Sequence, residues 1–212
     1  DIPGGLCTAW ERKDYTFDGC IHYLFGSGEG QPFNQVWQEL GAVQNRPMIN
    51  HDRFMTIVDE NGRSFIVYAN PDQLEAHMKA LSPADAKLSA AFASGVRQFM
   101  QFDMALMQKK PRELMNPGDW LEFVQKIVPY GPSVARWGFV SARNFAEKFQ
   151  DPLLRRAFCL MFGWPDIPVM VGMSVLAYMA TGNAGFPVGG SLAFAQAIEQ
   201  RYRDLGGEIH YN

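Results

Sequence analysis

Side chains able to act as nucleophiles, metal ligands or acid–base catalysts are few in this sequence and lie far apart along it. None of the four histidines stands at a telling spacing from a carboxylate and a nucleophile, and no Gly-x-Ser-x-Gly turn occurs. Cys20 and His22 lie two residues apart, which is too small a set for a zinc site. The sequence therefore predicts no metal site. It leaves the catalytic residues unassigned, with Asp18 and His22 as the nearest candidates.

A glycine-rich loop, Gly26-Ser27-Gly28-Glu29-Gly30, follows an apolar pair and precedes an expected helix. Strand, glycine loop and helix in this order are typical of phosphate- and dinucleotide-binding sites. The third glycine stands at the wrong offset, however, and Glu29 would bring a negative charge to the place of a phosphate. These departures favour an ordinary surface loop over a phosphate site.

The elements that would position these residues begin with two hairpins. Residues 6–11 and 15–21 are β-type runs joined by a polar turn, and residues 54–58 and 64–68 flank a second turn. In that second turn Asn61-Gly62 supplies two residues that tolerate the positive φ of a tight hairpin. The sequence therefore predicts two antiparallel strand pairs in its first third.

Helices are expected over most of the remainder, because apolar residues recur at spacings of three and four between proline and glycine breaks. Asn70 is the expected cap of one helix, and Ser82 with Asp85 is the expected start signal of the next. A glycine pair at 206–207 should end the last helix, and residues 208–212 read as a strand. The expected helices cover residues 33–40, 71–81, 83 to about 108, 119–127, 133–137, 142–149, 152–162, 169–180 and 191–205.

Composition predicts a folded protein that does not bind nucleic acid. Of the 212 residues 47% are hydrophobic and 19% charged, the net charge is −3, and the basic residues are scattered. Three cysteines are too few for the disulfide framework of a secreted protein, and no signal-peptide pattern opens the chain, so we expect a cytoplasmic location. Residues 169–180 form the longest unbroken apolar stretch, which is too short to cross a bilayer.

The fold class that follows is α/β, or α+β for the chain as an isolated segment: a mostly helical middle with small β-sheet elements and hairpins near both ends. Residue 1 is Asp, and the strand pattern at 208–212 has no partner after it. Both ends therefore read as interior, and we expect the chain to be a segment of a longer parent protein. Such a segment is expected to self-associate through strand edges or the apolar face of residues 169–180.

Two separated motifs resemble flavoproteins of the phytoene-desaturase type, which include carotenoid desaturases and isomerases and retinol saturases. The first motif is Pro3-Gly4-Gly5 followed by Phe17-Asp18-Gly19-Cys20. The second is Phe186-Pro187-Val188-Gly189-Gly190-Ser191, then a helix, then Leu205-Gly206-Gly207-Glu208. Their order and spacing are similar to those of the family, so the resemblance spans nearly the whole chain. The sequence departs from the family at Cys20, where the family commonly has glycine.

The resemblance implies that FAD is the cofactor of the parent, which would exchange hydride with an apolar substrate such as a polyene. It implies contacts to the cofactor from six residues: Gly4, Gly5, Asp18, Gly19, Gly189 and Gly190. The glycine-rich motif that binds the FAD pyrophosphate would lie upstream of residue 1. The isolated segment is therefore expected to lack FAD and to be inactive, while the parent is an oxidoreductase.

By the same resemblance, residues 1–50 are a residual part of the FAD-binding region, and residues 186–212 return to it. Residues 51–185 are expected to be a mainly helical substrate-binding domain with one β-hairpin. The candidate substrate-binding residues are His22, Met161, Trp164, Met170 and Met173, although a packed core would use the same methionines. Two alternatives stay open: a non-catalytic apolar-ligand or lipid-binding module, and a helical protein-interaction domain. A peripheral membrane contact of the parent stays open as well.

Overall fold

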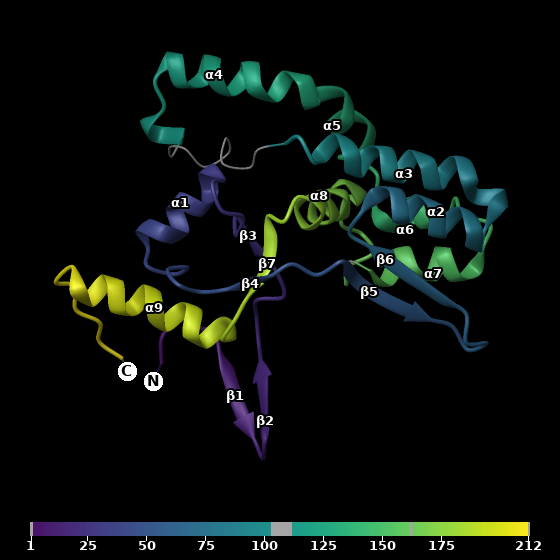
Figure 1. The fold of residues 1–212 in the computed structure, drawn as a ribbon. Coiled ribbons are helices and arrows are strands. Elements are labelled where there is room, and N and C mark those ends of the chain that lie inside the picture. The colour runs from purple at the N-terminus through teal and green to yellow at the C-terminus, as the bar shows by residue number, and fades with distance from the viewer. Residues whose placement is uncertain (1, 103–111, 162, 212) are drawn as a thin grey trace. The chain divides into compact units, whose positions relative to one another are not determined.

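A computed structural model describes residues 2–102, 112–161 and 163–211 of the chain (Figure 1). Its internal contacts divide the chain into two compact units. Unit 1 joins Asp1–His51 to Thr181–Asn212, and unit 2 is the continuous stretch Asp52–Ala180. The predicted fold class is confirmed, since small strand pairs accompany a mostly helical middle. The roles predicted for the parts, FAD-binding and substrate-binding, stay predictions.

The described part of unit 1 contains two small antiparallel sheets and two helices. Strands β1 and β2 form the first predicted hairpin, with Ala9 opposite Asp18 and Arg12 opposite Tyr15. The second sheet was not predicted: β7 lies between β3 and β4 and pairs antiparallel with both. The elements of unit 1 are β1 (Ala9–Arg12), β2 (Tyr15–Asp18), β3 (Leu24–Phe25), α1 (Pro32–Glu39), β4 (Met48–Ile49), β7 (Ala184–Pro187) and α9 (Gly190–Asp204).

The core of unit 1 is small and joins the start of the chain to its last helix. Leu24, Val43 and Phe194 are buried in it together with Ala42. Trp37 of α1 packs edge-on against Phe194, and its indole nitrogen donates to the Phe25 carbonyl oxygen at 2.7 Å. Helix α9 is thereby held on the sheet and on α1.

The loop at residues 26–30 is a structural joint of unit 1, which corrects part of the surface-loop prediction. Ser27 is buried, and its hydroxyl oxygen accepts a hydrogen bond from the Gly185 amide at 2.7 Å. The Asn183 side chain accepts a hydrogen bond from the Gly28 amide at 3.1 Å. The Ser27 hydroxyl and the Gly28 amide therefore bind β7 and the residue before it.

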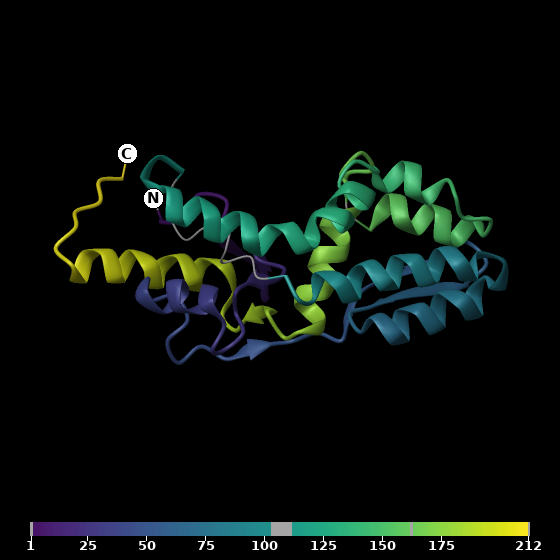
Figure 2. The same cartoon turned by 90° about the horizontal axis from the view of Figure 1, so that it is seen from above.

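Unit 2 packs several helices around one face of a hairpin (Figures 1 and 2). Helix α2 lies along both β6 and α3, and α3 also contacts α8. Within the described residues, no helix is both long and apolar enough to cross a membrane. The elements of unit 2 are β5 (Arg53–Val58), β6 (Ser64–Tyr68), α2 (Pro71–Leu81), η1 (Pro83–Asp85), α3 (Ala86–Phe99), η3 (Arg112–Leu114), α4 (Pro117–Ile127), η4 (Val128–Tyr130), α5 (Gly131–Trp137), α6 (Ala142–Ala146), α7 (Pro152–Leu160) and α8 (Val169–Ala180).

Phenylalanine rings form the centre of the unit 2 core. Phe158 of α7 lies 4.8 Å from the rings of both Phe92 and Phe149, measured between centroids. Phe145 and Phe65 lie 5.3 and 6.4 Å from it. All five rings are fully buried, so residues from one strand and three helical regions meet at a single point.

The start signals of α2 and α3 behave differently from one another. Asn70 caps α2 as predicted, because its side chain accepts from the amides of Asp72 and Gln73. Ser82 does not cap α3, which corrects the prediction. Its hydroxyl donates to the Asp85 carboxylate at 2.7 Å, and a 3₁₀ turn intervenes before the helix begins. The acid three residues on is therefore the partner of the serine and not a second cap.

Helix α3 ends at Phe99, short of the predicted end near residue 108, and residues 103–111 lie outside the described part. After Phe99 the chain tightens, since the amides of Gln101 and Phe102 bond to carbonyls three residues back. Hydroxyl groups then take the free carbonyls: Tyr130 donates to Gln101, and Tyr178 donates to Phe102 at 3.1 Å.

Two turn predictions met different outcomes. In the β5–β6 loop only Gly62 takes a positive φ, +78°, while the Asp59 carboxylate accepts from the amides of Asn61 and Arg63. The tight Asn-Gly turn was therefore wrong, and the loop is closed by an aspartate. The glycine stop of α9 is confirmed, with the Gly207 amide bonded to the Tyr202 carbonyl. Residues 208–211 form no strand, because none of the described segments pairs with them.

Candidate functional site

The first residues of α9 meet the end of the β1–β2 hairpin. The Asp18 carboxylate accepts hydrogen bonds from the Ser191 amide, at 2.7 Å, and from the Ser191 hydroxyl. The Ser191 hydroxyl oxygen in turn accepts from the Ile21 amide at 2.7 Å. We call the cluster of Asp18, Cys20, Ile21, Gly190 and Ser191 the Asp18–Ser191 site. It joins residues that lie 173 positions apart in the sequence.

Glycine is required on the α9 side of this site. Gly190 has φ +73°, and a Cβ there would lie 2.0 Å from an Asp18 carboxylate oxygen. A side chain at this position would push the carboxylate away from its hydrogen bonds to Ser191, and the positive φ adds strain of its own. The predicted cofactor residue Gly190 therefore has a structural task, which is to let the Asp18 carboxylate reach the helix start.

The N-terminal turn closes onto the same place. Gly4 has φ +97°, and a Cβ on it would lie 2.5 Å from the Cys7 carbonyl oxygen and 2.7 Å from the Ala195 Cβ. The Cys7 amide donates to the Gly4 carbonyl at 2.8 Å, and its thiol donates to the Ser191 carbonyl at 3.5 Å. The three predicted glycine segments, around residues 4–5, 18–19 and 189–190, are thus brought together in unit 1.

Opposing effects set the charge of Asp18. Burial raises the pKa of its carboxyl, but the hydrogen bonds from the Ser191 hydroxyl and amide and from the Cys20 amide lower it. The charge of His22 lowers it a little further. The net pKa lies below the usual value, so the carboxylate is ionised at neutral pH. A full negative charge then faces the first amides of α9, where the helix dipole favours it.

This arrangement can be compared with what an FAD would need. A pyrophosphate would bind the amides at a helix start, but at α9 the Asp18 carboxylate already accepts from the Ser191 amide, and its negative charge would repel a phosphate there. The α9 end therefore does not fit the phosphates. Gly5 does fit a close approach by a flat group: it has φ +55°, it is exposed, and nothing lies within 4 Å of the place of a Cβ.

Gly19 and Gly189 lie at the edges of the site. A Cβ on Gly19 would lie 3.1 Å from both the Thr8 carbonyl oxygen and the Trp10 ring. At Gly189, with φ +96°, it would lie 3.0 Å from the Arg46 guanidinium. Both positions are therefore crowded by this chain itself, and any contact with a cofactor would be made by the backbone.

Sequence reasoning missed two residues that build the site, Ser191 and Arg46. Arg46 donates to the carbonyl oxygens of Val188, Ala193 and Ala42 at 2.8, 3.0 and 3.1 Å. It thereby holds the turn that carries the glycine pair. The position of Ser191, directly after Gly-Gly at a helix start, is a local signal from which its role could have been predicted. Nothing local marks an arginine two of whose three partners lie more than 140 residues away.

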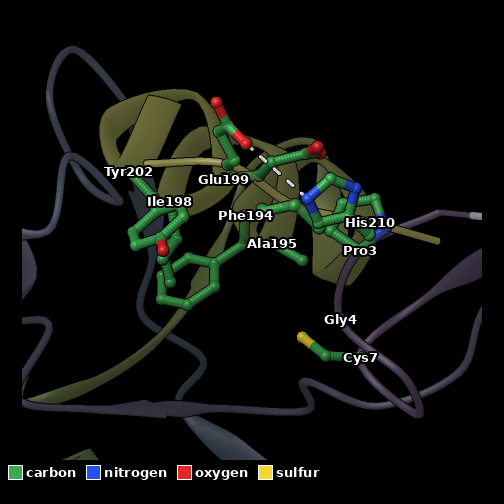
Figure 3. Close-up of a pocket in the computed structure, with 11 residues that line it drawn as sticks. Pro3, Gly4, Cys7, Phe194, Ala195, Ile198, Glu199, Tyr202 and His210 are labelled. Carbon is green, nitrogen blue, oxygen red and sulfur yellow. Dashed lines mark ion pairs between the residues drawn. The ribbon is translucent and has the colours of Figure 1, made fainter. Parts of the chain in front are cut away.

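A cavity of about 650 Å³ lies beside the site, between the N-terminal turn and α9 (Figure 3). Its volume is in the range of small-molecule pockets, and most of its lining side chains are apolar. In Figure 3 the Cys7 sulfur points toward the α9 side chains that line it. The lining residues are Pro3, Gly4, Cys7, Phe194, Ala195, Ile198, Glu199, Tyr202, Glu208, Ile209 and His210.

The predicted substrate-binding residues have no common environment. Met161 and Met173 are 2% and 0% exposed and belong to the unit 2 core, where a methionine fills space between helices. Met170 packs at the edge of that core, and Trp164 is 74% exposed. His22 belongs to unit 1 and is exposed. Their role in binding a substrate stays a prediction.

The comparisons with known proteins agree with the motif resemblance. The lycopene-forming phytoene desaturase of Pantoea ananas is 23% identical over 224 residues, which cover 100% of this chain and 42% of that protein. The corresponding enzyme of Pseudescherichia vulneris is 24% identical over 226 residues, with the same coverage. This chain is distantly similar to part of the phytoene desaturases.

The match has clear bounds. The chain spans 42% of the length of the curated relatives it matches, and no family model matches it. The resemblance drawn from Gly4-Gly5, Asp18-Gly19 and Gly189-Gly190 is confirmed at this distant, partial level. What the complete relatives do is a property of those proteins.

Proposed function

We propose that this chain is part of an FAD-dependent oxidoreductase of the desaturase, saturase or isomerase kind. It would contribute the part that binds an apolar substrate, together with one edge of the flavin site. The observation that supports this most is the meeting of three glycine segments at the Asp18–Ser191 site. Those segments are the ones for which the sequence resembles the phytoene-desaturase type. FAD, when bound, would supply the hydride chemistry.

The residues of this chain would shape and position the site. The Asp18–Ser191 hydrogen bonds hold the hairpin end against α9 and leave Gly5 exposed on the same turn as Gly4. Because Gly5 has no side chain, a planar ring could reach its backbone groups. The phosphates of the cofactor would need amides from outside this chain, since at the α9 start the ionised Asp18 carboxylate accepts from the Ser191 amide and would repel a phosphate.

Flavin content tests the proposal directly. The complete gene product that contains this chain should purify with FAD, seen as flavin absorbance, whereas the 212-residue chain alone should be colourless and bind FAD weakly. A complete product that holds no flavin after reconstitution would contradict the assignment. A 212-residue chain with stoichiometric FAD would contradict the account of where the phosphates bind.

A pair of matched glycine variants tests the edge at Gly5. Gly5→Ala and Gly30→Ala both add a methyl group into open space at a positive φ, +55° and +75°, so both should cost about 1 kcal/mol of stability. In the complete gene product we expect Gly5→Ala to weaken FAD binding about tenfold, the equivalent of about 1.4 kcal/mol. Gly30→Ala should leave it unchanged. Equal FAD affinities in the two variants would remove Gly5 from the site.

The cavity supports a second candidate, an apolar-ligand-binding module that acts without flavin. Its volume of about 650 Å³ and its apolar lining suit a lipid-like molecule. An environment-sensitive apolar fluorophore titrated into the 212-residue chain would report such binding, and Ile198→Glu should abolish it. Tight binding together with a flavin-free complete gene product would favour this candidate over the oxidoreductase.

A further inference from the structure

The register of the β1–β2 hairpin sets two cysteines opposite each other. Ala9 pairs with Asp18, and the hydrogen bond from the Gly19 amide to the Thr8 carbonyl, 2.8 Å, extends the same register by one pair. One step further, beyond the ends of both strands, this register brings Cys7 opposite Cys20. Residues directly opposite in an antiparallel pair point their side chains to the same face.

The backbone of the two cysteines indicates which kind of pair they form. The Cys7 amide donates to the Gly4 carbonyl and the Cys20 amide donates to the Asp18 carboxylate, so neither is directed to the opposite strand. Because Thr8 and Gly19 are hydrogen-bonded across the hairpin, the alternation of the ladder makes the next position a non-hydrogen-bonded one, at which Cα atoms in a regular pair stand about 4.5 Å apart and side chains are closest. Disulfides span Cα separations of about 4.4–6.8 Å, so this position accepts one.

The side chains support the backbone argument. Burial raises the pKa of the Cys7 thiol, and the charge of Cys20 and a hydrogen bond with the Cys20 thiol raise it further. The two sulfur atoms therefore lie within reach of each other. Cys20 is exposed and Cys7 is half-buried, and both are free thiols. The pair thus has one thiol open to solvent and one behind it.

We propose that Cys7 and Cys20 form a reversible disulfide by exchange with low-molecular-mass disulfides of the glutathione type. The Cys20 thiolate attacks one sulfur of the small disulfide, forms a mixed disulfide and releases one small thiolate. The Cys7 thiolate then attacks the Cys20 sulfur and releases the second. Two protein thiols are oxidised, one small disulfide is reduced to two thiols, and the two protons go to the released thiolates.

The order of attack follows from exposure and acidity. The thiolate is the nucleophile, and a raised pKa leaves Cys7 with less of it than an ordinary cysteine. Cys20 is also the thiol that a solution reagent can reach. Cys20 is therefore the entry thiol and Cys7 the resolving one. This inference does not depend on the proposed function, because it uses only the hairpin and its two thiols.

Closing the bond would change the surroundings of the Asp18–Ser191 site. Cys7 would no longer donate to the Ser191 carbonyl oxygen, and the Gly4–Cys7 turn would be tied covalently to the end of the hairpin. Cys7 also lines the cavity beside α9 (Figure 3). The redox state of this pair would thus alter one wall of the cavity.

Thiol mapping of the 212-residue chain tests the proposal. The folded chain is equilibrated with reduced and oxidised glutathione at a series of ratios, free thiols are blocked, and peptides are identified by mass spectrometry. We expect a Cys7–Cys20 cross-linked peptide, while Cys159, half-buried against the unit 2 core, keeps its free thiol. At one glutathione ratio, the folded chain should be at least about tenfold more oxidised than the urea-unfolded chain, since folding holds the thiols together.

Single variants test the order of attack. Cys7→Ser should trap a mixed disulfide with glutathione at Cys20, whereas Cys20→Ser should leave Cys7 mostly unmodified. The proposal is overturned if the folded chain forms no Cys7–Cys20 cross-link at any ratio, or forms it no more readily than the unfolded chain. Preferential glutathione addition to Cys7 in Cys20→Ser would overturn the assigned order.

Discussion

The segments within unit 2 and the segments within unit 1 are joined by different kinds of interaction. In unit 2 the segments meet through buried apolar side chains, with Phe158 surrounded by four other phenylalanine rings. In unit 1 the segments meet through hydrogen bonds between residues far apart in sequence, such as Asp18 with Ser191 and Ser27 with Gly185. Apolar packing is strong and non-directional, whereas these bonds need particular atoms at particular places. Unit 1, which contains the candidate site, therefore depends more than unit 2 on the exact positions of individual atoms.

One carboxylate in each unit makes the comparison specific. Asp85 of unit 2 is 4% exposed and accepts from the Ser82 hydroxyl and from the amides of Gln150 and Asp151. Asp18 of unit 1 does the same for Ser191 and Cys20 but is exposed. Both carboxylates join distant segments, so burial is the main difference between them. Their variants can therefore separate the effect of burial from that of bond number.

The largest expected effect is the loss of a ring from the unit 2 core. Phe158→Ala should lower the free energy of unfolding by about 3–5 kcal/mol, because it leaves a cavity that rigid neighbours cannot fill. Leu160→Ala is the matched control on the same helix, since Leu160 is 56% exposed, and should change stability by about 0.5 kcal/mol or less. Urea denaturation measures both. Similar losses in the two variants would mean that unit 2 is not stabilised by its aromatic centre.

The next effect in size is that of Asp85→Asn, which should cost about 1.5–3 kcal/mol at neutral pH because a buried charged acceptor is lost. Burial raises the pKa of Asp85, but hydrogen bonds from the Gln150 amide, the Ser82 hydroxyl and the Asp151 amide lower it to a net value below normal. Its stabilisation is therefore present above the unfolded pKa, about 3.9, and is lost as pH falls through the folded pKa.

Denaturation at several pH values checks this prediction. The difference between the native chain and Asp85→Asn should be largest at neutral pH and shrink toward acid, as the native carboxyl takes up its proton. A difference independent of pH would show that the ionised form of Asp85 is not what joins the segments.

The sequence predicted unit 2 better than unit 1, and the reason is physical. Helix α8 was expected at 169–180 and lies at Val169–Ala180, because Pro168 before it and Thr181-Gly182 after it are local signals. Apolar periodicity likewise gave α2 and the β5–β6 hairpin. Such patterns report on neighbours a few residues away, and signals at this distance determine where most of the unit 2 helices begin and end.

What local patterns could not give is the pairing of distant segments. Strand β7 pairs with β3 and β4, and the bond from Gly185 to Ser27 spans 158 positions. Strands this short carry almost no periodic signal. The glycine pairs marked the candidate site through family resemblance, but the carboxylate–hydroxyl contact that makes Gly190 necessary is a tertiary feature.

The smallest expected effect is that of Asp18→Asn, and it measures how far exposure weakens a joint of this kind. With its oxygen at the Oδ1 position the asparagine can still accept two of the three hydrogen bonds, but its amide nitrogen would then face the Ser191 amide, which is a donor, and water can replace part of the loss. We expect a cost of about 1 kcal/mol, below that of Asp85→Asn. Hydrogen exchange of the Ser191 and Ile21 amides should speed up about fivefold as the joint opens locally. Asp14→Asn, in the turn of the same hairpin, is the control and should leave the exchange of both amides unchanged.

Because the pKa of Asp18 is also lowered, the protection of these amides should be present above the unfolded pKa and fade as pH falls through the folded pKa. A cost equal to or greater than that of Asp85→Asn would break the comparison, since exposure would then not weaken the bonds that assemble unit 1.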